Sequence, residues 1–413
     1  MSEERIVLRN CEVIDPRDIR THLDRDGFKA FLKAHNEMAP EEVIEAVRAS
    51  GLKGRGGAGF DCGLKWKLAR EAQGDDKYLI CNADEGEVGT FKDRYILAND
   101  PFTLIEGMAI AGYTIGARKA YIYLRAEYHY LLDLLTNAID QVKEKGFLED
   151  LDIQIHEGAG AYICGEESAL IDSIEGQRGE ARLRPPFPST KGLWESPTVI
   201  NNVETLMNIP QIILKGARWF NGIGTEHSKG TKVFSISGDV ERPGVYELVM
   251  GSQLRELVID CAGAEKVKMV QVGGASGRII PYHMIDSALS YETFLGSGGI
   301  TVCNEMRDIL EIVYRDVEFF AEESCGKCTP CREGTEVMVE ILERLNGGDG
   351  TEQDIGALED LSHVMMLSSL CGLGQAAPVP VLDSLRYFRQ EYEDRIRQSL
   401  YLRSLQGISS SKI

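Results

Sequence analysis

The stretch YLICNADEGEVGTFKDR, residues 78–94, joins a short apolar run to an acidic segment that contains glycine. Its first four residues have the length and composition of a buried β-strand. Residues 82–94 are predicted to form an acidic loop. Because α/β sheets bind ligands beyond the carboxyl ends of their strands, this junction indicates both the fold class and the place of a site.

Helical and strand-like patterns alternate on both sides of this junction. Helices are expected at residues 27–36, 40–49, 64–72, 104–115 and 130–145, and further strands at 120–124 and 153–155. A glycine turn that begins at residue 158 leads into another helix. Strands that alternate with helices predict an α/β domain whose sheet is at least partly parallel.

The pattern changes further along the chain. Residues 181–205 are rich in proline and polar side chains, which predicts an extended segment that lies across the first domain. Residues 231–303 are rich in short strands and predict a small α+β domain. Helical patterns at 306–323, 333–345, 352–367 and 379–399 predict a C-terminal helical bundle.

Composition excludes several classes of partner. The 413 residues carry a formal net charge of −20, so nucleic acid and anionic lipid are not expected to bind. The N-terminal residues lack the apolar core of a secretory signal, and no run of about 18 apolar residues predicts direct membrane insertion. The ten cysteines are too sparse for a disulfide scaffold. We therefore expect a cytoplasmic protein.

Three closely spaced cysteines predict a metal centre. Cys325, Cys328 and Cys331 form a C-x2-C-x2-C motif, which suits three corners of an iron–sulfur cube. Cys371, in a glycine-rich corner between two predicted helices, is the best candidate for the fourth ligand. A zinc site built from the same cysteines is the alternative, but zinc ligands usually come as two separated pairs. The spacing favours a 4Fe–4S cluster.

A glycine-rich loop at residues 51–66, GLKGRGGAGFDCGLKW, contains the string G-x-G-x-x-G. The dinucleotide-binding fingerprint requires a strand before this string, whereas a helical pattern precedes it here. The loop is still suited to a ligand, because Gly54, Gly56 and Gly57 allow backbone amides to approach an anion or a flat ring. Arg55 and Lys65 add positive charge.

Two further loops carry candidate binding residues. The loop around Tyr162 and Gly165 enters a helix N-terminus, where Glu166 and Glu167 are expected to accept hydrogen bonds from ribityl or ribose hydroxyls rather than to meet a phosphate. The acidic loop contains Asn82, Asp84, Glu85 and Glu87 directly after a predicted strand. Calcium is conceivable there, but the spacing is not that of an EF-hand. Hydrogen bonding to a cofactor's polyol or amide groups is favoured.

Together these motifs resemble a known family. The chain contains GRGGAGF, NADEGE, GAGAYICGEESALI, RPPFP, INNVETL, SCGKCTPCREGT and SLCGLGQ in that order. This series is similar to the NADH-binding flavoprotein subunit of respiratory complex I, and to the diaphorase subunit of NAD-linked hydrogenases and formate dehydrogenases. The resemblance covers residues 25–395, or nearly the whole chain.

The resemblance implies a fold in three domains. A Rossmann-like α/β domain that binds FMN and NADH would occupy residues 1–225, with an N-terminal helical extension. A ubiquitin-like β-grasp (SLBB) domain would occupy residues 226–305. A four-helix bundle that binds the 4Fe–4S cluster would occupy residues 306–413.

The resemblance also assigns residues to cofactors. Lys65 would lie near the FMN phosphate, and Phe60 and Phe187 would help NADH to stack on the flavin. Glu87 would lie near the nicotinamide, with no side chain acting as an acid or base. The implied cofactor-binding set is Gly54, Arg55, Gly56, Gly57, Phe60, Lys65, Asn82, Asp84, Glu85, Glu87, Tyr162, Gly165, Glu166, Glu167, Phe187, Asn201 and Asn202.

The implied activity is that of an NADH dehydrogenase or diaphorase subunit, which passes electrons between NAD(H) and iron–sulfur clusters through FMN. The implied partners are a thioredoxin-like 2Fe–2S subunit and a larger iron–sulfur or catalytic subunit. The N-terminal residues favour a hydrogenase or formate dehydrogenase complex, with or without electron bifurcation. The alternatives are complex I itself and a non-catalytic iron–sulfur scaffold. Asp61-Cys62 replaces the family's usual Pro-Thr, and an acid there is expected to disturb NADH binding or the flavin potential.

Overall fold

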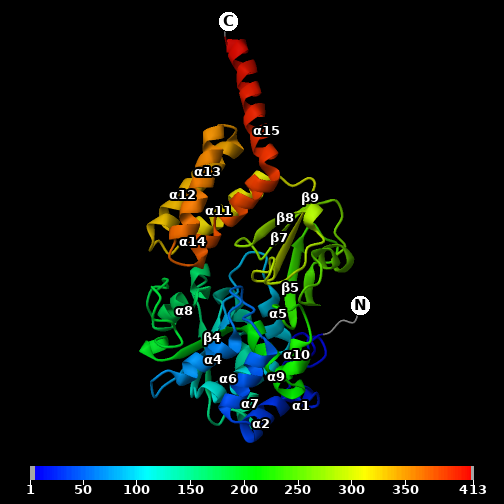
Figure 1. Cartoon of the computed structure of the whole chain (residues 1–413), viewed down its shortest axis with the longest axis vertical. Coiled ribbons are helices and arrows are strands. Elements are labelled where there is room, and N and C mark those ends of the chain that lie inside the picture. The colour runs from blue at the N-terminus through cyan, green and yellow to red at the C-terminus, as the bar shows by residue number, and fades with distance from the viewer. Residues whose placement is uncertain (1–4, 411–413) are drawn as a thin grey trace.

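The computed structural model describes residues 5–410, and it describes side chains as far as residue 399 and at Tyr401. Figure 1 shows a parallel sheet with its helices at one end of the molecule and the C-terminal helices at the other. A second sheet lies beside them. The chain thus has a mixed α/β fold with a helical C-terminal part.

The first part of the chain folds around a parallel sheet. Its strands are β1 (Tyr78–Ala83), β2 (Lys119–Leu124), β3 (Asp152–Glu157) and β4 (Thr198–Asn202), in the order β3-β2-β1-β4. Its helices are α1 (Ile19–Leu23), α2 (Lys29–Glu37), α3 (Pro40–Ser50), α4 (Cys62–Glu71), α5 (Lys92–Asn99), α6 (Pro101–Ile115), α7 (Leu132–Glu144), α8 (Glu167–Ile174), α9 (Val203–Lys215) and α10 (Ala217–Asn221). Short turns η1 (Ala126–Leu131), η2 (Tyr162–Gly165) and η3 (Leu193–Glu195) connect them.

Local signals explain the central helix of this part. The Asp100 carboxylate accepts a hydrogen bond from the Thr103 amide at the start of α6, and Pro101 occupies the first turn. Gly116 ends the helix with φ of 79°, a conformation that favours glycine. Because α6 is apolar on nearly all sides, it lies in the core between the sheet and α9.

The two faces of the parallel sheet are covered differently. Leu79, Cys81 and Ile122 face the core built by helices such as α6 and α9. On the other face, the Tyr78 ring lies 5.2 Å from the Trp194 ring. The polar, proline-rich segment therefore crosses this face as predicted, although only as far as residue 197.

Two of the predicted boundaries are wrong. Residues 198–202 form β4, which pairs in parallel with β1, and residue 203 begins α9. Only Val199 and Ile200 are apolar in this strand, but pairing with β1 holds the segment as an edge strand of the sheet. Lys92–Asn99 forms α5, although the sequence pattern assigns residues 92–94 to the acidic loop. Glu85 supplies the hydrogen-bond acceptor for the start of this helix from outside it.

The second sheet is mixed and follows the strand order β6-β5-β9-β7-β8. Its strands are β5 (Thr231–Gly238), β6 (Gly244–Val249), β7 (Val267–Val272), β8 (Arg278–Pro281) and β9 (Gly299–Asn304), with short helical turns η4 (Glu256–Cys261) and η5 (Tyr282–Met284). β5 and β9 run parallel, and the other neighbours run antiparallel. Residues 231–303 thus contain short strands, as the sequence predicted.

The C-terminal part is helical. It contains α11 (Ile309–Glu323), α12 (Thr329–Gly347), α13 (Glu352–Ser368), α14 (Gly372–Ala376) and α15 (Val379–Ser410). α11 packs on α12 and α15, and α13 also packs on α12 and α15. Phe388 interrupts the helical backbone of α15. In the part of the chain that the structure describes, no helix has the length and apolar character needed to cross a membrane.

Candidate functional site

The candidate site lies where β1 and β4 end. The parallel register pairs Cys81 with Asn201 and Asn82 with Asn202, so both strands deliver polar side chains to the same edge. The Asn82 side-chain amide donates a hydrogen bond of 2.9 Å to the Gly165 carbonyl, which fixes the second glycine loop beside this edge. The Asn201 side-chain oxygen accepts a 2.8 Å hydrogen bond from the Trp66 indole.

The first glycine loop connects α3 to α4, so no strand leads into it, as the sequence predicted. The Gly54 amide donates a hydrogen bond of 2.8 Å to the Phe60 carbonyl and closes the loop. Gly57 has φ of 126°, which a residue with a side chain rarely adopts. A Cβ at Gly56 would lie 3.1 Å from the Asn202 Cβ, so the loop rests closely on the start of α9.

Arg55 lies behind this loop and is completely buried. Its backbone amide donates to the Thr205 hydroxyl at 2.8 Å, and its guanidinium donates to the Lys229 carbonyl at 2.5 Å. The Tyr291 hydroxyl donates to the Gly54 carbonyl at 2.5 Å. Arg55 therefore ties the glycine loop to the second sheet, and its charge is directed away from the loop's surface.

Asp84 is a buried acid with an open hydrogen-bonding position. Its Oδ2 has no partner among the described residues and lies 3.7 Å from the position of a Cβ built on Gly165. Burial raises the pKa of Asp84 to about 7, although Arg125 nearby opposes the rise. An unpartnered buried oxygen at the edge of a glycine-lined loop fits a hydroxyl or N–H donor of a bound cofactor.

Glu85 faces the opposite direction. Its carboxylate accepts hydrogen bonds from the Asp93 and Arg94 amides at 2.8 and 3.1 Å, and from the Tyr128 hydroxyl at 2.9 Å. Burial, with Asp93 nearby, raises the pKa of Glu85 to about 7. The structure thus places Glu85 against the first turn of α5, beneath the acidic loop.

Glu87 belongs to a hydrogen-bonded group that includes the second sheet. Its Oε2 accepts from the Tyr162 hydroxyl at 2.7 Å and from the Ser276 hydroxyl at 2.6 Å, and its Oε1 accepts from the Ser276 amide at 3.0 Å. Burial raises the pKa of Glu87, and the Ser276 hydrogen bonds oppose the rise. No motif in the sequence points to Ser276, because it lies 189 residues away.

The two acids of the second glycine loop are paired with bases. Glu166 caps α8 by accepting hydrogen bonds from the Ser168 and Ala169 amides, and it forms an ion pair with Arg184. Glu167 forms an ion pair with Lys65, whose ammonium also donates to the Ile200 carbonyl at 2.8 Å. The Lys65–Glu167 pair brings the first and second glycine loops together, and the Glu166–Arg184 pair joins the second loop to the proline-rich segment.

Two aromatic side chains lie exposed around this region. Phe60 is 49% exposed and Phe187 is 54% exposed, which leaves each ring free to stack on a planar ligand. Asp61, between Phe60 and α4, is the acid expected to disturb the nucleotide site. Its side chain instead accepts a hydrogen bond of 2.6 Å from the Leu64 amide and caps α4.

The four predicted ligand cysteines lie together. They line a small hollow, whose walls also contain Ile163, Ala181, Ser324, Lys327, Leu370 and Leu373. Burial and the nearby Cys328, Cys371 and Cys325 thiols raise the pKa of Cys331 to about 11. A Cβ at Gly374 would lie 2.8 Å from the Cys331 Cβ, so glycine allows the corner that carries Cys371 to approach.

Backbone donors point at the sulfur atoms. The Leu370 amide lies 3.5 Å from the Cys328 Sγ, and the Leu373 and Gly374 amides donate to Cys371. Such donors suit the sulfur atoms of an iron–sulfur cluster. Among the side chains that the structure describes, no group of three or more His, Cys, Asp or Glu is arranged around the position of a single metal ion.

The segment at η2 joins the cysteine hollow to the acidic loop. Ile163 lines the hollow, and the preceding residue, Tyr162, donates its hydroxyl to Glu87. The Tyr162 amide donates to Glu323 at 2.8 Å, and its ring lies 5.1 Å from the Phe319 ring of α11. The two candidate cofactor sites therefore share a wall.

Two family models match the chain. Residues 47–211 match the model described as the Nuo51 FMN-binding domain, and residues 311–395 match the NADH-ubiquinone oxidoreductase-F iron-sulfur binding region. The matched ranges contain the glycine loops and the four cysteines, respectively.

Several relatives are similar along nearly the whole chain. The F 2 subunit of the NADH-quinone oxidoreductase of Rhizobium meliloti is 44% identical, over 96% of this chain and 98% of its own length. The HndC subunit of the NADP-reducing hydrogenase of Solidesulfovibrio fructosivorans is also 44% identical, over 95% of this chain and 83% of its own length. The crystal structure of an H2-reduced NAD+-reducing [NiFe]-hydrogenase matches with a TM-score of 0.85 and 43% identity. The match covers 88% of this chain and 63% of that chain.

Both the motifs and the site geometry agree with these similarities. This chain therefore belongs to the family that contains the F subunits of NADH-quinone oxidoreductases and the related subunits of NAD- and NADP-reducing hydrogenases.

Proposed function

We propose that this protein is a flavoprotein subunit that passes electrons between NAD(H) and iron–sulfur clusters through FMN. The observation that carries the proposal is the shared wall at η2. One residue, Tyr162, contacts the acidic loop, and the next, Ile163, lines the cysteine hollow. Two redox groups held on either side of this wall would be close enough to exchange electrons.

FMN fits the edge of the parallel sheet. The Asp84 oxygen without a partner and the Asn82 and Gly165 contact provide polar groups, and the glycines of the first loop carry no side chains that would block a flat ring. When bound, FMN would accept a hydride from NADH and release electrons singly, while the protein orients the reactants and excludes water. The FMN contacts proposed are Gly54, Gly56, Gly57, Lys65, Asn82, Asp84, Tyr162, Gly165, Glu166, Asn201 and Asn202.

The exposed Phe60 and Phe187 rings would hold NADH over the flavin, with Glu87 near the nicotinamide. Glu167 would hold Lys65 in place near the FMN phosphate. Arg55 and Glu85 would support the site from behind, because the Arg55 guanidinium donates to the Lys229 carbonyl and the Glu85 carboxylate accepts from the first turn of α5.

Cys325, Cys328, Cys331 and Cys371 would hold a 4Fe–4S cluster. The hollow between them and the amides aimed at Cys328 and Cys371 support this assignment. Lys327 and Arg332 would offset part of the cluster's negative charge. We assign the second sheet to a ubiquitin-like β-grasp (SLBB) domain at residues 226–305 and α11 to α15 to a four-helix bundle at 306–413. The FMN- and NADH-binding domain would comprise residues 1–225.

The relatives' names support a place in a multi-subunit complex. HndC is named as a hydrogenase subunit, and the Rhizobium relative is named as an NADH-quinone oxidoreductase subunit. We propose a cytoplasmic hydrogenase or formate dehydrogenase complex, in which a thioredoxin-like 2Fe–2S subunit and a larger iron–sulfur or catalytic subunit are the partners. Electron bifurcation would require further clusters on those partners.

An anaerobic spectrum tests this function. The purified full chain, supplied with iron, sulfide and FMN, should show a flavin band near its usual visible position and should lose it on addition of NADH. Cys371→Ala should lower the iron content from four atoms per cube to three or fewer. Cys303→Ala, which alters a buried cysteine outside the hollow, is the matched control. A chain that binds iron but no FMN would support the scaffold alternative.

A further inference from the structure

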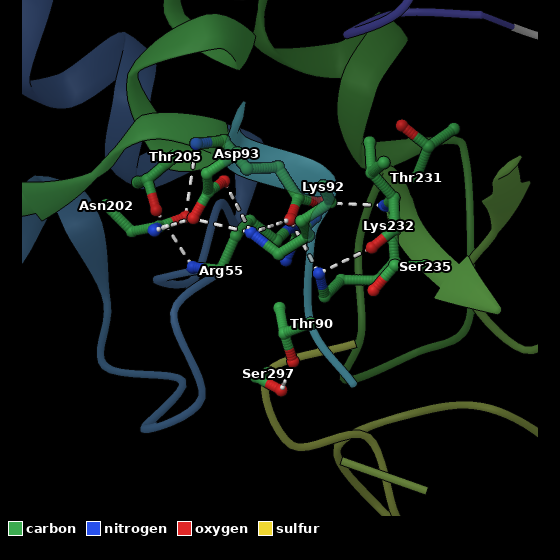
Figure 2. A network of polar contacts seen from close by, with 12 residues as sticks. Arg55, Thr90, Lys92, Asp93, Asn202, Thr205, Thr231, Lys232, Ser235 and Ser297 are labelled. Carbon is green, nitrogen blue, oxygen red and sulfur yellow. Dashed lines mark hydrogen bonds and ion pairs between the residues drawn. The ribbon is translucent and has the colours of Figure 1, made fainter. Parts of the chain in front are cut away.

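The second sheet reaches the flavin side of the molecule through a buried network of charges. Figure 2 shows Lys232 from β5 pointing toward Lys92 and Asp93 at the start of α5. The Lys232 ammonium lies 2.5 Å from the Glu204 carboxylate, and the Lys92 ammonium lies 3.0 Å from it. All of these side chains are almost completely buried.

The network continues to a residue of the proposed FMN site. Lys92 donates to Asp93 at 2.7 Å, and the Asp93 carboxylate accepts from the Asn202 side-chain amide at 2.7 Å. The Asn202 oxygen accepts from Lys92 at 3.3 Å and from the Glu204 amide at 3.1 Å. Both ends of the Asn202 side chain are therefore fixed by charged groups or by the first turn of α9.

The same turn of α9 supports the first glycine loop. Thr205 accepts the Arg55 amide hydrogen bond, and Asn202 is the closest neighbour of Gly56. Glu204 lies between Asn202 and Thr205 in the sequence. Its Oε2 accepts a hydrogen bond from the Lys232 ammonium, and its Oε1 accepts one of 2.8 Å from the Val233 amide. A displacement of Glu204 would move the turn on which the glycine loop rests.

Stability alone is a poor reason for such a network. Burying charges costs free energy that their attraction offsets only in good geometry, and apolar replacements of similar volume are often no less stable. Three basic side chains meet three acidic side chains in this network, so the two kinds are equal in number. The basic residues are Lys92, Lys232 and Arg55, and the acidic residues are Asp93, Glu204 and Glu85. Glycine at position 298 leaves the space that the Lys232 ammonium fills, because a Cβ there would lie 2.7 Å from it.

We infer that Lys232 is a positioning residue for the flavin site, which it controls through Glu204, Lys92 and Asn202. The inference rests on the proposed function, because it assumes that FMN occupies the edge beside Asn202. It assigns to the second sheet a part in building the flavin site, in addition to any role in assembly.

The test compares three variants of the flavin-free full chain, with FMN as the titrant. Lys232→Met removes the ammonium but leaves Glu204 paired with Lys92, and Glu204→Gln keeps the side-chain shape without its charge. Asp383→Asn is the matched control, because Asp383 is buried and pairs with Arg278 of the second sheet, away from the glycine loop. Thermal unfolding, FMN affinity, the midpoint potential and the visible spectrum of the bound flavin are measured.

Lys232→Met and Glu204→Gln should weaken FMN binding about tenfold, equivalent to about 1.4 kcal/mol, and should shift the midpoint potential. Asp383→Asn should lower the unfolding temperature but leave both FMN properties unchanged. If Lys232→Met also changes only the unfolding temperature, the inference is wrong. If Lys232→Met does not fold, Glu204→Gln decides by the same criteria. A wild-type chain that binds no FMN would overturn the proposed function, and this inference with it.

Discussion

At the scale of single residues, the site depends on acids whose surroundings differ sharply. Asp84 retains an unpartnered oxygen among the described residues, whereas Glu85 has three donors and Glu87 has three. The sequence placed all three acids in one loop and predicted one kind of role for them. After the end of β1 the three side chains point to different neighbours. Asp84 lies at the sheet edge beside Gly165, Glu85 contacts α5, and Glu87 contacts Ser276 of the second sheet.

The pKa of Asp84 predicts a pH-dependent stability in the flavin-free chain. The folded value of about 7 lies above the ordinary 3.8, so the folded chain holds an extra proton between these values and its stability falls as pH rises through that window. Asp84→Asn removes the titrating carboxyl group, so the variant lacks this loss of stability. The free energy of unfolding of Asp84→Asn, relative to that of wild type, should therefore rise between pH 5 and pH 7 by up to about 1.4 kcal/mol per pH unit. The unfolding temperature of the variant relative to wild type should rise with it. A pH-independent difference would contradict the assigned shift.

Ser276 predicts an effect on hydride transfer without loss of FMN. Ser276→Ala removes the 2.6 Å hydrogen bond to Glu87, a contact to a charged group worth about 1.5–3 kcal/mol. Glu87 should then hold the nicotinamide less well, and flavin reduction by NADH in a stopped-flow experiment should slow about tenfold or more. Ser297→Ala, which instead loses the contacts of its hydroxyl to Thr90, the Gly273 carbonyl and the Gly299 amide, should retain the wild-type rate. Equal rates in both variants would exclude this role.

At the scale of secondary structure, helix starts hold the loops of the site. Asp61 caps α4, Glu166 caps α8 and Asn202 caps α9, so each glycine loop or strand end leads into a helix that is fixed by a site residue. The unusual Asp61 therefore takes a structural role as the N-cap of α4. Sequence comparison marked it as unusual, but only the backbone geometry shows what its carboxylate contacts.

Loss of the Asp61 cap should destabilise α4 without changing the chemistry. Asp61→Ala is expected to cost about 1 kcal/mol, seen as a lower unfolding temperature, while Asp61→Asn should keep most of the stability because asparagine also caps helices. The NADH affinity of both variants should stay within about twofold of wild type. A large gain in NADH affinity in both variants would instead support the expected repulsion of the nucleotide.

At the scale of the whole molecule, segments distant in sequence join the two sheets. The Glu247 carboxylate of β6 accepts hydrogen bonds from the Ile6, Val7 and Leu8 amides and from the Thr231 hydroxyl. The N-terminal segment therefore crosses from the first part of the chain to the second sheet (Figure 1). Lys232, Ser276 and Tyr291 connect the same two parts near the site.

Weakening this N-terminal attachment should expose its backbone. Glu247→Gln replaces one of the two acceptor oxygens by an amide group that faces backbone N–H donors, so the amides of residues 6–8 lose part of their acceptor set. Hydrogen exchange of these amides should become at least about tenfold faster, while exchange in α12 and α13 stays the same. Unchanged protection of residues 6–8 would show that Glu247 does not hold the segment.

The sequence by itself determined the features that local spacing encodes. The cysteine motif, the glycine loops, the α/β alternation and the helical C-terminal part all follow from neighbouring residues, and the structure agrees with them. The sequence did not reveal β4 within residues 181–205, because a short polar strand acquires its identity from the sheet that pairs with it. Nor could it reveal Lys232, Glu204 or Ser276, since a buried charged or polar residue has the same letter as an exposed one. Only the tertiary structure brings these side chains from the second sheet and α9 to the candidate site, where they meet their hydrogen-bond partners.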